Sequence, residues 1–403
     1  MNKKVMALAV AGALAAPAVA FAQASNVSIY GRANVGFGTY EAAGATNDVN
    51  GNLNLAKRNR VWDTGSRLGF RVNEDLGGGL RAFVQIENGV SLDNGSTTGQ
   101  GGQANSSAGT FASRDSFAGI GTRFGDVRFG RQSVYWAGGA IQQSGANYVD
   151  TEIGFMNGAS FGRVAGPSAR TNNVLSVTTA TFGGFNATIS YAPQNEANQG
   201  SATVGTGGHL NGVTARYNGV VNVQVDIASN SAAAGGTLGS LSKIEGQKIG
   251  IGYPYMPGAQ ISVITATNKN TFAAGVGLFA AAGDVVKQTS MNVNWEHMFG
   301  NIQVLAAYGK LAKAKGCTET ITAVQTPGAT GAGTTCEATG AKAIDLAVKY
   351  HLSKRTGVYV AYHKIENESN NTADYGGAAM TSANTLPVGA DPKIMSIGVM
   401  HNF

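Results

Sequence analysis

The chain is 403 residues long, and only 13% of its residues are charged while 43% are hydrophobic. Because disordered chains combine high charge with few apolar residues, this composition argues against a long disordered protein. The net charge of +6 is too small and too dispersed for a nucleic-acid partner, which requires clustered Lys and Arg. No apolar stretch of about 20 residues follows the N-terminal region, so a helical membrane protein is excluded. A membrane barrel is not excluded, because its strands hide apolar residues in alternation.

Residues 1–22 have the layout of a secretory signal peptide. Lys3 and Lys4 give a positive start, an apolar run follows over residues 5–19, and Ala20-Phe21-Ala22 forms a small-x-small cleavage site. We therefore predict an exported protein whose mature part, residues 23–403, is one domain.

Segments of about ten residues that alternate strictly between apolar and polar side chains recur along the mature part. The clearest segments cover residues 185–191, 221–227, 291–296 and 344–350. A period of two places one set of side chains on each face of a sheet, whereas a helix needs a period of 3.6. In the first strand of the mature part, which begins at Val27, we expect Ile29 and Phe37 to face lipid and Tyr30 and Arg32 to face a lumen. Polar lumen residues indicate a hydrated channel rather than a packed core.

The connectors between these segments alternate in length. Seven are short, at residues 73–79, 124–126, 182–184, 218–219, 255–258, 300–301 and 352–357. Eight are long, at residues 40–64, 91–112, 134–165, 194–210, 229–243, 269–286, 313–340 and 368–391. Such a series joins sixteen strands and leaves both termini on the short-turn side, which predicts an all-β, 16-stranded antiparallel transmembrane β-barrel. A soluble β-sandwich fits less well, because one core rarely grows past ~250–300 residues.

Two cysteines, Cys317 and Cys336, flank a Gly/Thr/Ala-rich stretch that has the composition of a long loop. An even cysteine count in an exported protein favours a disulfide, here closing that loop. A metal site is the alternative, but no other Cys or His lies near enough in sequence to complete one, and free thiols are the remaining possibility.

Several short motifs together make the whole mature chain resemble the general, non-specific porins of Gram-negative bacteria, of the β-proteobacterial type. The motifs are VSIYGR at 27–32, GSRLGF at 65–70, EDLGGGL at 74–80, FAGI at 117–120, FGRQ at 129–132 and the terminal Phe403. The resemblance implies a homotrimer in the outer membrane, in contact with outer-membrane lipid and lipopolysaccharide. It also implies that the third long loop folds inward to narrow each pore, and that the outer-membrane insertion machinery recognises Phe403.

The resemblance further implies a constriction in which basic residues on the wall face carboxylates on the third loop. Carried over by position, the candidate constriction residues are Arg32, Arg67, Arg114 and Arg163 on the wall and Asp150 and Glu152 on the loop. Arg71, Arg81, Arg131 and Arg170 are less certain pore-lining residues. For any single arginine, a solvated lumen charge or a structural salt bridge is the alternative interpretation. The loop acids come earlier and are fewer than in many relatives.

No motif of the sequence makes a convincing catalytic site. Residues 158–162, GASFG, match the Gly-x-Ser-x-Gly nucleophile pattern, but that motif needs a strand-turn-helix elbow with acid and His partners. The five histidines are scattered without metal-ligand spacing, and no phosphate, dinucleotide or calcium loop is present. We therefore expect no enzymatic activity, no metal and no cofactor.

Two functions remain. The first is a water-filled channel for passive diffusion of small hydrophilic solutes and ions, in which four wall arginines against two loop acids predict a moderate preference for small anions beside neutral solutes. The second is a surface barrel whose long loops bind a partner or host ligand, with pore activity secondary. Bilayer conductance separates the two.

Overall fold

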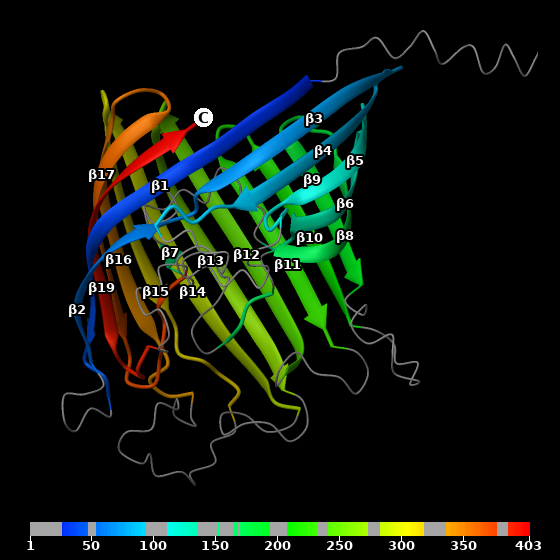
Figure 1. Ribbon diagram of the computed structural model, residues 1–403. Coiled ribbons are helices and arrows are strands. Elements are labelled where there is room, and N and C mark those ends of the chain that lie inside the picture. Colours follow the sequence, from blue (N-terminus) through cyan, green and yellow to red (C-terminus); the bar gives the residue numbers. More distant parts are fainter. Residues whose placement is uncertain are drawn as a thin grey trace, which may run out of the picture.

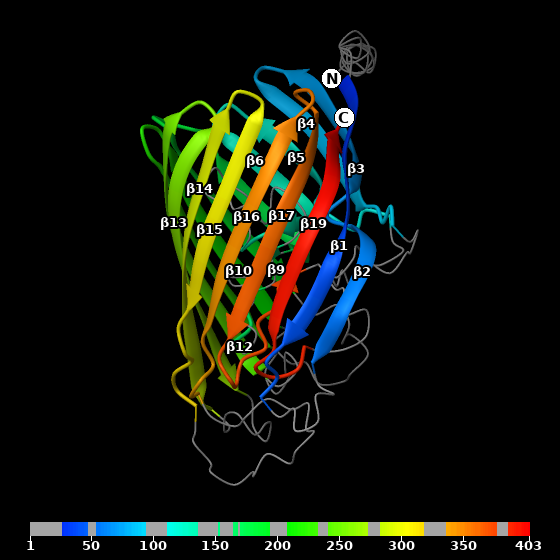
Figure 2. The same cartoon turned by 90° about the vertical axis from the view of Figure 1, so that its left-hand side faces the viewer.

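The computed structural model describes residues 26–46, 54–93, 111–135, 152–153, 164–167, 170–193, 208–232, 241–272, 283–317, 336–376 and 386–403. Within them, one antiparallel sheet closes on itself, because the first strand, β1 (Asn26–Ala43), pairs with the last, β19 (Asp391–Asn402). Figures 1 and 2 show the tilted strands of this barrel, and Figure 2 shows the start of β1 and the C-terminus at the same end. Residues 1–22, with the predicted signal peptide, lie outside the described residues.

The other barrel strands, with the exception of the second and third, pair with the barrel strands before and after them in sequence. These strands are β2 (Leu55–Asp63), β3 (Arg67–Gly77), β4 (Leu80–Gly89), β5 (Ser116–Thr122), β6 (Gly125–Ser133), β8 (Arg170–Thr179), β9 (Phe185–Pro193), β10 (His209–Asn218), β11 (Asn222–Ser231), β12 (Leu241–Met256), β13 (Ala259–Phe272), β14 (Val285–Phe299), β15 (Ile302–Leu311), β16 (Ala341–His351) and β17 (Thr356–Asn367). Two short strands, β7 (Glu152–Ile153) and β18 (Tyr375–Gly376), pair with each other outside the barrel sheet.

β2 and β3 together form one interrupted barrel strand. β3 pairs with the first part of β1, from Asn26 to Arg32, and β2 pairs with its later part, from Val35 to Ala42. The break lies at Gly65, whose φ of 78° favours glycine. With β2 and β3 counted as one, the 17-stranded sheet of the described residues is a 16-stranded barrel, which confirms the prediction.

The predicted long connector at residues 40–64 is wrong, because most of it is strand. β1 continues to Ala43, and β2 covers Leu55–Asp63, with Tyr40 opposite Arg58. The side chains of residues 56–59 are all exposed, so neither face of this part of β2 needs apolar residues. The alternation that identifies the other strands is therefore missing here.

The two faces of the sheet carry the side chains that the alternation predicts. On β16, Leu346 and Val348 are 48% exposed on the outer face, whereas Asp345 and Ala347, between and beside them, are buried on the lumen side. Ile29 and Phe37 of β1 are likewise exposed, as predicted. No helix of the described residues is long and apolar enough to cross a membrane.

Part of the lumen is filled by the eighth long connection, between β17 and β19. Its residues Ala373, Tyr375 and Leu386 are buried against Ile365 and Ile394, which point to the lumen from β17 and β19. The Tyr375 hydroxyl also donates a hydrogen bond of 2.9 Å to the carbonyl of Pro392. This connection therefore narrows the lumen on the β17–β19 side.

Candidate functional site

The described residues at both ends of the third long loop lie against the barrel wall formed by β11, β12 and β14. Tyr135, two residues after the end of β6, is buried, and its carbonyl accepts a 3.4 Å hydrogen bond from Nζ of Lys248 on β12. The same ammonium lies 5.3 Å from the centre of the Tyr135 ring and 3.3 Å from the carboxylate of Asp226 on β11. At its other end, Val164 packs against Val286 of β14. Both ends therefore lie inside the barrel.

A short piece of the same loop pairs with the eighth connection. Ile153 of β7 lies opposite Tyr375 of β18, and Glu152 lies opposite Gly376. Because Tyr375 is buried among the lumen residues described above, this pairing holds the backbone of the third loop at the β18 segment. The third loop and the eighth connection therefore meet inside the lumen.

Three of the predicted wall bases come together in the lumen. Arg32 of β1 lies directly opposite Arg67 of β3 in the sheet register. Arg32 interacts electrostatically with Arg67 and with Arg114, which precedes β5. Arg114 in turn interacts with Arg67 and with Arg170, at the start of β8. The result is a basic track along the wall from β1 to β8, with Arg170 as its fourth member.

Two members of this track have a carboxylate partner. Nε of Arg114 lies 2.6 Å from Glu87 on β4, and Nε of Arg170 lies 2.8 Å from Asp115. Arg32 and Arg67 have no carboxylate within 4.0 Å in the part of the chain that the structure describes. The track therefore keeps a positive excess in its described part.

The remaining less certain arginines lie beside or beyond the track. Arg71 stacks on the ring of Tyr30 at 4.0 Å and donates to Gln85. Arg81 forms a 2.6 Å ion pair with Asp126 close to the short turns, and its side chain is 47% exposed.

Arg131 bonds to backbone and amide groups rather than to an acid. Its Nε donates to the carbonyl of Ser113 at 2.9 Å, and its guanidinium also bonds to Asn172. It remains within electrostatic range of Arg170, so it lies next to the track.

The predicted loop residues are only partly placed. Asp150, Arg163 and the GASFG motif at 158–162 lie outside the described residues, and Glu152 is described by its backbone alone. The acids that contact the track, Glu87 and Asp115, were not among the predicted residues. A signal for Glu87 exists, since it shares the lumen parity of Arg81 and Gln85 on β4; Asp115 directly follows Arg114.

The two cysteines are joined by a disulfide, with their Cα atoms 5.5 Å apart. Cys336 is buried against Val164, at the end of the third loop, and Val286 of β14. The bond therefore lies closer to the barrel than a freely exposed loop would place it. Among the described residues, no group of three or more His, Cys, Asp or Glu side chains is arranged to hold a metal ion.

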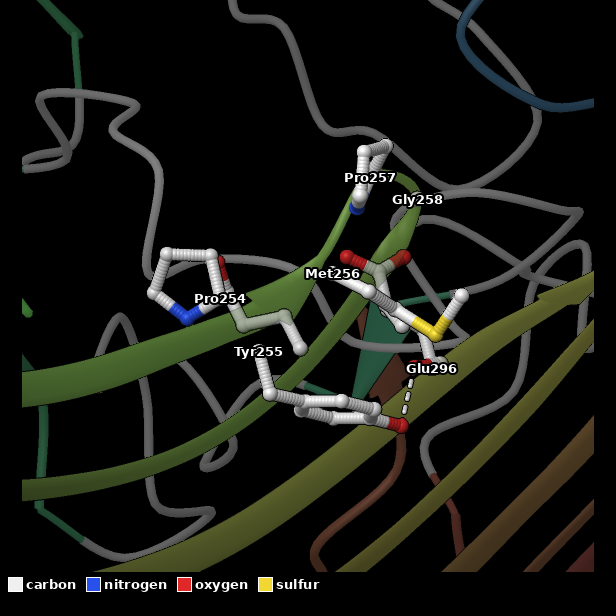
Figure 3. Close-up of a pocket in the computed structure, with 8 residues that line it drawn as sticks. Pro254, Tyr255, Met256, Pro257, Gly258 and Glu296 are labelled. Carbon is white, nitrogen blue, oxygen red and sulfur yellow. Dashed lines mark hydrogen bonds between the residues drawn. The ribbon is translucent and has the colours of Figure 1, made fainter. Parts of the chain in front are cut away.

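A cavity of about 410 Å³ opens at the short turn between β12 and β13, where the Tyr255 hydroxyl points at the backbone carbonyl of Glu296 (Figure 3). It is also lined by Met256 and Gln260. None of the arginines of the basic track lines it, so it is separate from the candidate constriction.

Comparison with known proteins agrees with this architecture. The family model of the Gram-negative porins matches residues 7–370. Outer membrane porin protein 32 of Delftia acidovorans is 32% identical over 240 residues, which are 59% of this chain and 62% of that protein. The major outer membrane protein P.IB of Neisseria gonorrhoeae is 30% identical over 224 residues, 55% of this chain and 57% of that protein. The alignments thus span about 60% of these relatives.

Among solved structures, the anion-selective porin from Comamonas acidovorans superposes with a TM-score of 0.67 at 24% identity, covering 94% of this chain and all of that one. At that identity the likeness concerns the fold. With a family match over most of its length and a closed 16-stranded barrel, the chain belongs to the Gram-negative porin family and resides in the bacterial outer membrane.

Proposed function

We propose that this protein is a passive diffusion channel for small hydrophilic solutes and ions. A polar lumen supports the proposal, because the inner face of a strand such as β14 carries Asn292, Asn294 and Glu296 while its outer face carries apolar residues. The proposed role is transport without chemistry, so no enzymatic activity and no cofactor are part of it.

The observation that carries the proposal furthest is the basic track. Arg32 and Arg67 lie opposite each other without an acidic partner in the described part of the lumen, and the partners of Arg114 and Arg170 neutralise only those two. Fixed charges along a narrow, low-dielectric channel favour ions of opposite sign. We infer a moderate preference for small anions, including phosphates and carboxylates, while neutral solutes also pass.

We further propose that three copies assemble into a homotrimer that contacts outer-membrane lipid and lipopolysaccharide. Outer-face side chains such as Ile249, Ile251 and Val263 are 40% to 52% exposed on one chain, as expected for a surface that lipid or another copy covers. Chemical cross-linking of the protein in native membranes tests the stoichiometry, and a monomer as the largest species would contradict it.

Reversal potentials in planar bilayers test the channel function. In a KCl gradient, the purified protein should give large, steadily open conductance steps. Its reversal potential should be shifted toward the equilibrium potential of chloride. Absence of steps would remove the diffusion function and leave the surface barrel whose loops bind a partner. Open channels that favour potassium at low salt would retain the pore and overturn the anion preference.

A further inference from the structure

Lys349 is a lumen cation outside the predicted set of arginines. Lys349 is on the inner face of β16 and is only 6% exposed. Its stem passes over the backbone of Gly357 on β17, where an added Cβ would come within 2.6 Å of its Cε. Its Nζ ends 3.5 Å from Sδ of Met400 on β19. The side chain thus reaches across the two next strands.

This path brings the ammonium to the start of the basic track. Met400 lies opposite Asn34 of β1, and Arg32 is two residues earlier on the same face of that strand. Tyr359 of β17 donates a 3.2 Å hydrogen bond to Asn34 and so links β17 to β1 across β19. Lys349 and Arg32 interact electrostatically, which agrees with this placement.

Neither cation is neutralised by a close acid in the described residues. Among the residues that the structure describes, no carboxylate lies within 4.0 Å of Arg32 or Lys349, and the buried Nε of Arg32 has no hydrogen-bond partner. The carboxylate that acts on Arg32 from a distance is Asp63, whose oxygens accept the backbone N–H groups of Ser66 and Leu92. Two neighbouring cations and a buried, unused donor are a combination that an oxyanion satisfies.

We propose that Lys349 and Arg32 form an oxyanion-binding subsite on the β16–β1 wall, for carboxylate or phosphate groups of permeating solutes. The inference rests on the proposed channel function and adds a local binding site to the general preference for anions. Lys349 supplies a compact charge, and Arg32 supplies the buried Nε donor. Because permeation requires release, occupancy is weak and brief.

Single-channel recording with inorganic phosphate tests the subsite. In KCl at fixed ionic strength, added phosphate should reduce the chloride current with a saturating dose dependence. Lys349→Met, which removes the charge and keeps an apolar stem beside Met400, should weaken this block at least threefold. Lys349→Arg should largely retain it. Lys310→Met, at an exposed position of β15, is the matched control and should leave the block unchanged.

A second variant separates position from charge. Gly357→Ala keeps every charge but displaces the lysine stem, so it should also weaken the phosphate block. An unchanged block in Gly357→Ala or in Lys349→Met overturns the subsite, and an equal loss in Lys310→Met assigns the effect to the general field instead. These outcomes all require conducting channels, whereas a wild-type protein without conductance overturns the proposed function itself.

Discussion

Arg114 and Glu87 form an ion pair of 2.6 Å in the lumen wall, with side chains only 13% and 10% exposed. The Tyr30 hydroxyl donates a 3.0 Å hydrogen bond to the same carboxylate. Arg67, by contrast, has no carboxylate within 4.0 Å in the described residues. Removal of Arg114 would therefore leave the Glu87 carboxylate without its partner in the wall, whereas removal of Arg67 would leave no such unpaired acid among the described residues.

Arg67→Ser should shift the reversal potential toward cations and widen the pore slightly. It removes a charge that the described residues do not neutralise, so folding should be little affected. The effect should be larger at 0.1 M than at 1 M salt, because the screening length falls from ~10 Å to ~3 Å. Reversal potentials at both salt concentrations, with Lys310→Ser as control, measure it. Identical potentials for Arg67→Ser and wild type would show that this arginine does not face the ion path.

Arg114→Ser should lower stability as well as anion preference. It leaves Glu87 in the wall without its partner, and breaking a buried pair in this way costs about 3–5 kcal/mol. Because both side chains here keep some exposure, we expect the lower end of that range. Adding Glu87→Gln should recover most of the stability. Denaturant unfolding of the single and double variants in detergent measures the effect, and equal midpoints for both would argue against the pair.

Replacing both cysteines, Cys317→Ser with Cys336→Ser, should leave assembly and conductance nearly intact. A disulfide that closes a loop of this length contributes about 3 kcal/mol in the chain-entropy model. Because Cys336 packs against Val164 and Val286, part of this contribution should reach the barrel and lower its resistance to heat. Heat-dependent mobility of the folded protein tests this. Titratable thiols in the native, unreduced protein would refute the bond.

Residues 371–376 of the eighth long connection should be more stable against local unfolding in mild acid than at neutral pH. Burial raises the pKa of Asp374 to about 6, from an ordinary 3.8. The folded state therefore binds this proton more tightly than the unfolded state, and stability rises as pH falls from about 6 toward about 4. Hydrogen exchange of residues 371–376, corrected for intrinsic rates, should be slower at about pH 5 than at about pH 7. Asp374→Asn should abolish the difference; a difference that persists in it has another origin.

Deleting Phe403 should reduce the amount of folded protein without changing the conductance of the molecules that do assemble. The N–H and carbonyl of Phe403 both bond to Gly31, at 3.1 and 2.9 Å, and its ring occupies the space beside that glycine. The deletion thus loosens the closure of β19 on β1, and it removes the residue that we propose the insertion machinery recognises. Folded yield in outer membranes and single-channel conductance are the two measurements. Normal yield would sink this proposal.

The strand pattern of this protein is determined locally, and it was readable from sequence. Period-two alternation on segments such as residues 344–350 exists because one face meets lipid and the other meets the lumen. Over residues 56–59 of β2 all four side chains are exposed, so the apolar-polar alternation is absent there. For this reason the sequence did not predict this strand. The lumen parity of Arg32 and Arg67 follows from the same alternation.

Pairing inside the lumen was decided by the tertiary structure. Glu87, 27 residues before Arg114, neutralises it because β4 and β5 are neighbours in the sheet, and no sequence spacing announces such a contact. Lys349 reaches the Arg32 region only because the last barrel strand closes on the first. Alternation gives each side chain its face, but the distance between two lumen charges depends on barrel closure and on side-chain paths across the strands.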